Sequence, residues 1–588
     1  MHRGRERGWG DRSAPADHLQ TEPVPATPEP PSGAAGRPEV ALTATPMRTT
    51  LFHRGSVYTP SDPFATAMVV AGDAVAWVGS DEAARAQVGQ VDEVVDLEGA
   101  LVTPAFVDGH VHTTDTGLAL TGVPLTDARS LGEALEMVER ASRAARGRPV
   151  LGHGWDETAW PEGRPPTRGE LDRASHGGVV YLSRVDVHSA VVSSALAQAC
   201  GLRGHDGWSD SGRVERDAHL VVREATRAAM DPGVRRELQT VALRAAAAAG
   251  IATLHEMAAP HIAPRADTAG LAQLGADPML PDVLTYRGEF AADEHAARAL
   301  VAELAAEGVP AHGLAGDLNI DGSIGSRTAA FTYPYTDAGT QDHCGHLFLD
   351  ADQVAVHLVA CTLAGVQGGF HVIGDVGVRA AAQGLRRAAE LVGADRLRAA
   401  RHRFEHVEGA GPQEVAVMAD LGVSASVQPA FDALWGGDDS LYVRRLGAER
   451  GPTLNQIGTM AAAGVVLAFG SDSPVTPFDP WGGVRAAVLH RTAGQRISAR
   501  AAFAAHTRGA HRAARRDGAG VLALGAEATF AVWEPTDLVV QAPDSRVAAW
   551  STDERSGTPG LPDLSPGVAA PACRRTVLRG RTIYAAGE

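Results

Sequence analysis

The sequence contains no lysine, so all 53 of its basic residues are arginine. Alanine, glycine and arginine are frequent, which indicates a coding bias. This bias explains most of the absence of lysine. The absence still has a chemical consequence, because no side chain here can form a lysine Schiff base or a lysine carbamate. Reactions that depend on a catalytic lysine are therefore excluded.

Cysteine is also scarce, and the arrangement of the four cysteines excludes further classes of protein. Cys200, Cys344, Cys361 and Cys573 lie far apart, and none belongs to a C-x-x-C pair. This pattern argues against a zinc finger and against a disulfide framework, and it predicts a reduced, cytoplasmic setting. The formal net charge of −17 argues against binding to nucleic acid.

Long apolar runs are missing as well. No run approaches the 18 or more residues of a membrane span, so we expect no membrane association. Residues 1–48 are polar, with prolines concentrated in Pro23–Pro31, and they contain no apolar core of a signal peptide. We interpret them as a disordered leader, or as the result of a start site assigned too far upstream.

The remaining sequence predicts two interleaved domains. Residues 49–103 and 516–588 are rich in short β-like runs, which we expect to combine into one small β-sandwich domain. Between them, 104–515 alternates apolar runs with alanine-rich helical stretches, as in a parallel (β/α)₈ TIM barrel. The stretch of about 113–250 is too long for one βα unit, so an insertion over the barrel mouth is expected there.

Two histidines carry the strongest chemical signal. His110 and His112 stand in "VTPAFVDGHVHT", after an apolar strand and the pair Asp108–Gly109. Residues two apart in an extended segment point the same way, so both imidazoles can bind one metal ion. The alternative is two unrelated histidines in a loop, because an H-x-H pair alone is common.

Three further residues follow apolar runs at predicted strand ends. His371 lies in "GGFHVIGD", His406 in "RFEHVE" after Glu405, and Asp472 in "LAFGSDSPV". Taken singly, each histidine has a structural alternative, and Asp472 could cap a helix. In this order on separate strand ends, they match a barrel metal site with three or four protein ligands and an open water position.

These motifs resemble the amidohydrolase superfamily, in particular its amidohydrolase 3 branch of YtcJ-like proteins and N-substituted formamide deformylases. The matching segments extend from about residue 50 to the end of the chain, and include "GHGWDE", "YLSRVDVHSAVVSSAL", "DGSIGSRTAAFTYPY" and "TVLRGRTIY". The resemblance implies metal ligation by His110, His112, His371, His406 and Asp472. It also implies that Asp472 is the general base that deprotonates the attacking water and then protonates the leaving nitrogen.

Two departures from the family pattern matter. The usual P-G-F before the H-x-H motif is Pro104–Ala105–Phe106 here, which is a small change. Many relatives also have a carboxylated lysine that links two metals, and the corresponding residue here is Asp317. Asp317 could supply a shorter bridge, or the site could hold one metal, which we favour. Other carboxylate or amide candidates are Asn319, Asp321 and Glu256, the last of which could instead be an acid at a helix start.

Six other residues fall in family-like motifs, and we expect them to line the substrate pocket or to be structural: Trp155, Asp156, Arg184, His188, Ser326 and Arg327. Arg327 could bind an acidic substrate group or hold a loop carboxylate. The expected cofactor is a divalent metal, one ion or two, with zinc first and iron or manganese as alternatives. The expected partner is a small-molecule substrate, and a homodimer remains open.

The expected reaction is hydrolysis of a C–N bond in an amide, formamide or cyclic amide. The same site could instead serve deamination, ester hydrolysis or isomerisation, because a fold does not fix a reaction. A third interpretation is a catalytically weak binding protein, suggested by the missing lysine. The substrate itself cannot be inferred from the sequence.

The missing lysine generates a first prediction. Bicarbonate should not change metal loading of the purified protein, because no lysine can be carboxylated; a bicarbonate requirement for activation would contradict this account. Asp317→Asn should lower the metal content from two ions to one if Asp317 is a bridge. If the site holds one ion, the content should stay at one and activity should change little.

Overall fold

The computed structural model describes residues 48–86, 88–228, 230–340, 342–541, 550–551 and 558–587. The predicted leader, 1–48, lies outside these residues apart from Arg48. Within the described ranges, no helix combines the length and the apolarity that crossing a membrane requires.

A barrel of eight parallel strands forms the centre of the protein. Each strand is buried along nearly its whole length, which explains why these segments are apolar runs rather than alternating ones. The strands, in their order around the sheet, are β7 (Phe106–Val111), β13 (Ile251–Ala258), β14 (Asp282–Arg287), β15 (Gly313–Leu314), β16 (Gln367–Val372), β17 (Arg403–His406), β18 (Ser424–Val427) and β19 (Val466–Phe469).

The first and last strands of the barrel meet through the loops that follow them. His112 donates its backbone N–H to the Ser473 carbonyl at 2.9 Å, and the Asp472 N–H donates to the His110 carbonyl at 2.8 Å. Val111 and Ser473 form a parallel bridge. Backbone hydrogen bonds therefore close the ring at the carboxyl end of the strands, where the predicted ligands lie.

Helices cover the outside of the barrel and return the chain from each strand to the next. One of them, α10 (Ala351–Ala364), begins at a capping box formed by Asp350 and Gln353 and ends at Gly365, whose φ of 76° suits glycine. The other principal barrel helices are α8 (Arg265–Gly275), α9 (Glu294–Ala306), α11 (Asp375–Val392), α12 (Ala394–Ala400), α13 (Pro412–Asp420), α14 (Pro429–Trp435), α15 (Leu441–Leu446), α16 (Ile457–Ala462), α17 (Pro480–Val488), α18 (Ala499–Ala504) and α19 (Ala510–Ala513).

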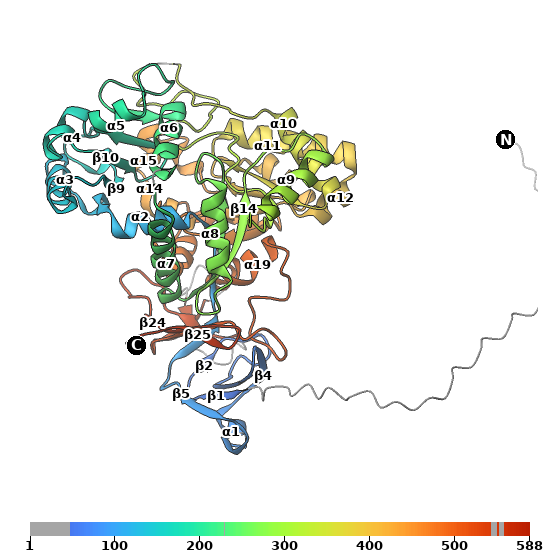
Figure 1. The fold of residues 1–588 in the computed structure, drawn as a ribbon. Helices are drawn as coiled ribbons and strands as arrows, with labels where there is room; N and C mark the ends of the chain where they lie inside the picture. The colour runs from blue at the N-terminus through green and yellow to red at the C-terminus, as the bar shows by residue number, and fades with distance from the viewer. Residues whose placement is uncertain are drawn as a thin grey trace, which may run out of the picture. The chain divides into compact units, whose positions relative to one another are not determined.

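Between β7 and β13 the chain builds a separate α/β layer (cyan to green in Figure 1). Its five strands are, in spatial order, β12 (Arg213–Glu215), β11 (Ser189–Val192), β10 (Val180–Arg184), β9 (Val150–Trp155) and β8 (Val123–Pro124). Its helices are α2 (Thr113–Thr121), α3 (Leu131–Ala145), α4 (Arg168–Ala174), α5 (Ser194–Ala199), α6 (Arg216–Ala228) and α7 (Pro232–Ala248). The insertion thus follows directly on the H-x-H motif.

Strands from the two ends of the chain share one sheet, as the blue and red segments of Figure 1 show. Its order is β2 (Ser56–Val57), β6 (Leu101–Pro104), β20 (Phe530–Trp533), β24 (Cys573–Leu578) and β25 (Arg581–Ala585). A second sheet contains β4 (Ala74–Gly79), β3 (Ala67–Ala71), β1 (Thr49–His53) and β5 (Glu93–Asp96). The predicted (β/α)₈ barrel with a terminal β-sandwich is confirmed, while the numerical domain limits stay predictions.

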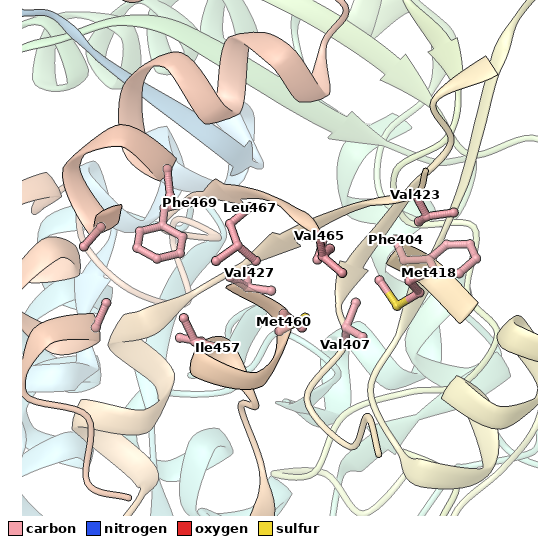
Figure 2. Close-up of a cluster of buried hydrophobic side chains, with 14 of the residues drawn as sticks. Phe404, Val407, Met418, Val423, Val427, Ile457, Met460, Val465, Leu467 and Phe469 are labelled. Atoms are coloured by element: carbon pink, nitrogen blue, oxygen red, sulfur yellow. The ribbon is translucent and has the colours of Figure 1, made fainter. Parts of the chain in front are cut away.

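The hydrophobic core lies between the barrel strands and the surrounding helices. Figure 2 shows one part of it, where side chains of β17, β18 and β19 meet those of α13 and α16. The residues in contact there include Phe404, Met418, Val427, Ile457, Met460, Leu467 and Phe469. Because this packing fixes β17 and β19 relative to each other, it also fixes the loops that follow these strands.

Phe106 joins the barrel to the β domain and provides a stability prediction. Its fully buried ring lies 5.0 Å from the ring of Trp481 and 5.6 Å from that of Trp533. Phe106→Ala should therefore lower the free energy of unfolding by about 3–5 kcal/mol in urea denaturation. Phe64→Ala, at a site that is 53% exposed, is the control and should change it by less than about 0.5 kcal/mol. Equal effects would contradict this role.

Candidate metal centre

Six predicted residues meet at the carboxyl ends of the barrel strands. His110 belongs to β7, His371 to β16 and His406 to β17, while the other three lie in loops directly after strands. All six side chains are buried. They are His110, His112, Asp317, His371, His406 and Asp472.

Two carboxylates face the H-x-H pair. His112 Nε2 lies 3.2 Å from Asp317 Oδ2 and 3.2 Å from Asp472 Oδ1. His110 Nε2 lies 3.4 Å from Asp317 Oδ1 and 3.4 Å from Asp472 Oδ1. The arrangement brings two imidazoles and two carboxylates to one point.

The other two histidines also lie near Asp317. His371 Nδ1 lies 3.7 Å from Asp317 Oδ1, and a ligand atom of His406 lies within 4.8 Å of ligand atoms of His110 and Asp317. The His371 and His406 ring centroids are 4.5 Å apart. Asp317 is therefore surrounded by the four histidines of the cluster.

Each of three histidines is held by its outer nitrogen. His110 Nδ1 donates to Glu405 Oε2 at 3.0 Å, His406 Nδ1 to Gln428 Oε1 at 2.9 Å, and His371 Nε2 to the Gly322 carbonyl at 3.3 Å. Because each acceptor receives a hydrogen bond from the outer N–H, the inner nitrogen carries a lone pair when the ring is neutral. In that form three lone pairs point inward.

The inward atoms have no partners of their own. Among the residues that the structure describes, six buried atoms of the cluster lack a hydrogen bond: His110 Nε2, His112 Nδ1, His371 Nδ1, His406 Nε2, Asp317 Oδ1 and Asp472 Oδ1. Burial without a partner is costly for polar atoms. Imidazole nitrogens and carboxylate oxygens at this spacing are the donor set of a divalent cation, so the residues present fit one.

Glu405 is itself held by an arginine. Arg403 Nε lies 2.6 Å from Glu405 Oε1, and both side chains are completely buried. Burial alone would raise the pKa of Glu405, but Arg403 and His110 outweigh it and lower that pKa to about 2. Glu405 is therefore ionised and keeps the proton on the outer nitrogen of His110.

Nearby histidines keep the two central carboxylates ionised. Burial opposes ionisation of both, yet His110 and His112 outweigh it, hold the pKa of Asp317 well below its usual value and lower the pKa of Asp472. Burial lowers the pKa of His406 to about 3, with His371 and His110 adding to the effect, so His406 is neutral. Anionic carboxylates and a neutral imidazole are the forms that bind a cation.

Backbone strain marks the same place. Asp472 has φ of 55° and His406 has φ of 68°, in the left-handed region that non-glycine residues rarely adopt. Asp108 stabilises the loop of Asp472, because Ser471 donates to it from both its N–H, at 2.9 Å, and its hydroxyl, at 2.6 Å. The fold thus imposes these conformations to aim the side chains.

With this geometry in place, comparison with known proteins decides the family. The sequence profile of the Amidohydrolase family matches residues 93–584. The chain belongs to the Amidohydrolase family. The predicted resemblance to its amidohydrolase 3 branch is confirmed.

Two relatives and one solved structure illustrate this amidohydrolase relationship. Putative amidohydrolase YtcJ of Bacillus subtilis (strain 168) is 25% identical over 472 residues, 75% of this chain and 84% of that protein. N-substituted formamide deformylase of Arthrobacter pascens is 31% identical over 156 residues, 26% and 29% respectively. An uncharacterized metal-dependent hydrolase from Pyrococcus furiosus is 25% identical, with a TM-score of 0.62 over 82% of this chain and 98% of that one.

The other carboxylate and amide candidates of this amidohydrolase have different surroundings. Asp321 accepts hydrogen bonds from the backbone N–H groups of Ile373, Gly374 and Ala330. Glu256 accepts hydrogen bonds from the Thr113 N–H at 2.8 Å and its hydroxyl at 2.6 Å, at the start of α2. Asp321 and Glu256 therefore orient loops around the centre, whereas Asp317 lies within it.

Most of the predicted pocket residues contact protein groups. Trp155 donates its indole N–H to the Leu182 carbonyl at 2.8 Å, and Ser326 donates to Asp186 at 2.8 Å. Arg327 forms a two-pronged pair with Asp337, at 2.9 Å for each bond. Trp155 thus joins strands β9 and β10 of the insertion, while Ser326 and Arg327 hold loop carboxylates.

Arg184 and His188 reach the cavity. Arg184 is fully buried and pairs with Glu157 at 2.9 Å, with Asp156 at 3.0 Å and with Asp186 at 3.2 Å, while it lines a cavity that includes His112, Asp317 and Asp472. The His188 ring lies 5.3 Å from that of His371. Burial lowers the pKa of His188 to about 4, with His371 contributing.

Further residues that were not predicted from the sequence line the same cavity. Glu408, two positions after His406, faces it beside Asp472 and accepts a hydrogen bond from the Tyr442 hydroxyl at 2.5 Å. Burial raises the pKa of Glu408 to about 7. Phe431 and Trp435 of α14 form an apolar wall. Glu408 belongs to the motif "RFEHVE", so the sequence contained a signal for it. Helix α14 contains no motif, so no sequence signal indicated that Phe431 and Trp435 line the cavity.

The geometry of the centre predicts that replacing one of its histidines removes the metal selectively. His371→Ala should remove most bound metal and most activity, because it deletes an inward lone pair. His357→Ala is the control: this buried histidine lies outside the centre and bonds to the Ala291 N–H at 3.1 Å and the Leu314 carbonyl at 2.9 Å. It should lower stability by about 1–3 kcal/mol and leave metal content intact. Metal analysis and denaturation measure both, and full metal retention by His371→Ala would refute the assignment.

Proposed function

We propose that the protein is a metal-dependent hydrolase that cleaves a C–N bond of an amide, formamide or cyclic amide. One observation carries the proposal: the inner nitrogens of His110, His371 and His406 converge, without partners, on two ionised carboxylates. Family membership supports hydrolysis, and the name of one relative, N-substituted formamide deformylase, supports a C–N bond.

Zinc is the ion that we propose, with iron and manganese as alternatives, because imidazole nitrogen and carboxylate oxygen suit it. A divalent cation at this position would polarise the scissile carbonyl and lower the pKa of water to about 7. Asp317 Oδ1 faces His110 and His371 while its Oδ2 faces His112, which is compatible with one ion or with two.

Asp472 is the proposed general base. Its buried carboxylate lines the cavity together with His112 and His406, so a carboxylate oxygen can take a proton from a water molecule there. The water oxygen then bonds to the carbonyl carbon, and the C–N bond breaks with its electron pair on nitrogen. Asp472 returns the proton to that nitrogen, which completes the hydrolysis.

The experiment is a hydrolysis screen of the zinc- or iron-loaded protein with N-formyl amines, N-acyl amino acids, hydantoin-like rings and aryl esters. Asp472→Asn should keep some metal and lose about 10²–10⁴-fold or more in rate, since the amide cannot act as the base. Asp479→Asn is a matched control in the following loop, where the carboxylate accepts from the Gly482 N–H, and asparagine caps a helix equally well.

Amine release that Asp472→Asn abolishes and Asp479→Asn preserves would support the proposal. Hydrolysis of the esters alone, or turnover unaffected by Asp472→Asn, would contradict it.

A further inference from the structure

A second cavity opens beside the metal centre, between the insertion and the barrel. Its volume is about 360 Å³, and its wall includes His112 and Asp317 of the centre. On the insertion side the wall includes Arg223, and on the barrel side His261 and Asn319. A molecule bound at the centre can therefore extend toward Arg223.

Arg223, on helix α6, presents unused hydrogen-bond donors. The residue is 8% exposed, and its Nη2 lies 2.9 Å from Asp115 Oδ2. Among the described residues, its Nε and Nη1 have no hydrogen-bond partner, and neither is enclosed as a fully buried unpaired atom. These nitrogens are therefore available to a ligand while Asp115 holds the guanidinium in place, in a residue that lines this cavity and also a smaller one with Asp115 and Arg227.

The charges around Arg223 do not balance. Arg223 and Arg227 both pair with the single carboxylate of Asp115, while Arg235 pairs with Asp267 at 2.9 Å. With the half-buried Arg235, this group has three guanidinium groups and two carboxylates. Burying a charge that lacks its own partner is costly, and an anion entering the cavity would supply that partner.

The other charged groups of this cavity do not neutralise the excess positive charge at Arg223. Arg216 is turned to Asp206, with Nε 2.7 Å from Oδ2 and Nη2 2.8 Å from Oδ1. Asp217 is exposed, and Asp317 belongs to the metal centre. An anion at the inner end of the cavity would thus meet Arg223.

The cavity on the other side of the centre differs in character. Phe431, Trp435 and Leu441 line it, and it shares His112, Asp317 and His188 with the cavity of Arg223. The metal centre therefore lies between a pocket with one aromatic wall, lined also by Arg184, Asp186 and Glu408, and a cavity that contains Arg223. A substrate that fits both has an apolar group on one side of its scissile bond and an anionic group on the other.

We propose that Arg223 binds the carboxylate of an anionic amide substrate, of the class of N-acyl amino acids with an apolar or aromatic group. The inference rests on the proposed function and deepens it. Arginine suits this task because its planar guanidinium binds carboxylates in a fixed geometry and keeps its charge at any physiological pH.

The test compares two probes that differ only in charge, N-phenylacetylglycine and N-phenylacetylglycinamide, each with its aromatic group on the carbonyl side of the scissile bond. Binding to the zinc-loaded protein is measured by calorimetry, and hydrolysis by phenylacetate release. A hydrogen-bonded charge of this kind corresponds to a preference of about 10- to 100-fold for the carboxylate. Arg223→Gln should remove that preference, Arg223→Lys should keep part of it, and the control Arg216→Gln should leave it unchanged.

The outcomes separate the two proposals. Equal binding of both probes by the unaltered protein, or a preference that survives in a folded Arg223→Gln variant, overturns the role of Arg223. If Arg223→Gln does not fold, a preference undiminished in Arg223→Lys overturns it as well. Tighter, Arg223-dependent binding without phenylacetate release supports the anion site and counts against C–N hydrolysis, whereas phenylacetate release without a carboxylate preference does the reverse.

Discussion

The hydrogen bonds between the loops after β7 and β19 are the constraint on which the metal centre depends. Strands β7 and β19 begin and end the barrel, so their side chains come from opposite ends of a chain segment of more than three hundred residues. The bonds from Asp472 N–H to His110 and from His112 N–H to Ser473 place three of the six central residues in one register. Asp108 reinforces this register by accepting hydrogen bonds from Ser471. The carboxylate of Asp108, which is not among the proposed ligands, therefore helps to position the carboxylate of Asp472.

Much of this arrangement could be predicted from the sequence, because strand ends of a parallel barrel meet at one edge. His110, His112, His371, His406 and Asp472 each follow an apolar run, and that pattern alone brings them together. The fold and the family predictions are confirmed. The placement of Asp317 rather than Asp321 could not be derived, because alternation assigns both to the same strand face, and only the loop geometry turns Asp321 toward the Ile373 and Gly374 backbone.

The residues of the substrate cavities were harder to predict. Arg223 lies on an amphipathic helix of the insertion, where one arginine among several gives no sign that it faces a cavity. The motif residues Trp155, Ser326 and Arg327 belong to recognisable segments, yet their side chains bond to protein groups. A local sequence motif indicates the backbone conformation of one segment. The wall of a cavity instead depends on how the insertion packs on the barrel, and a local sequence pattern does not encode that packing.

The sheet shared by the two ends of the chain has a consequence for synthesis. The indole of Trp533 donates to the Thr103 hydroxyl across 430 residues of sequence, and β6 pairs with β20 along its whole length. At about 5–20 residues per second, β6 leaves the ribosome roughly 20–90 s before its partner strand exists. During that interval the nascent chain carries an unpaired, apolar strand edge. Cellular factors that shield such edges would therefore be needed longer for this protein than for a barrel without a shared terminal sheet.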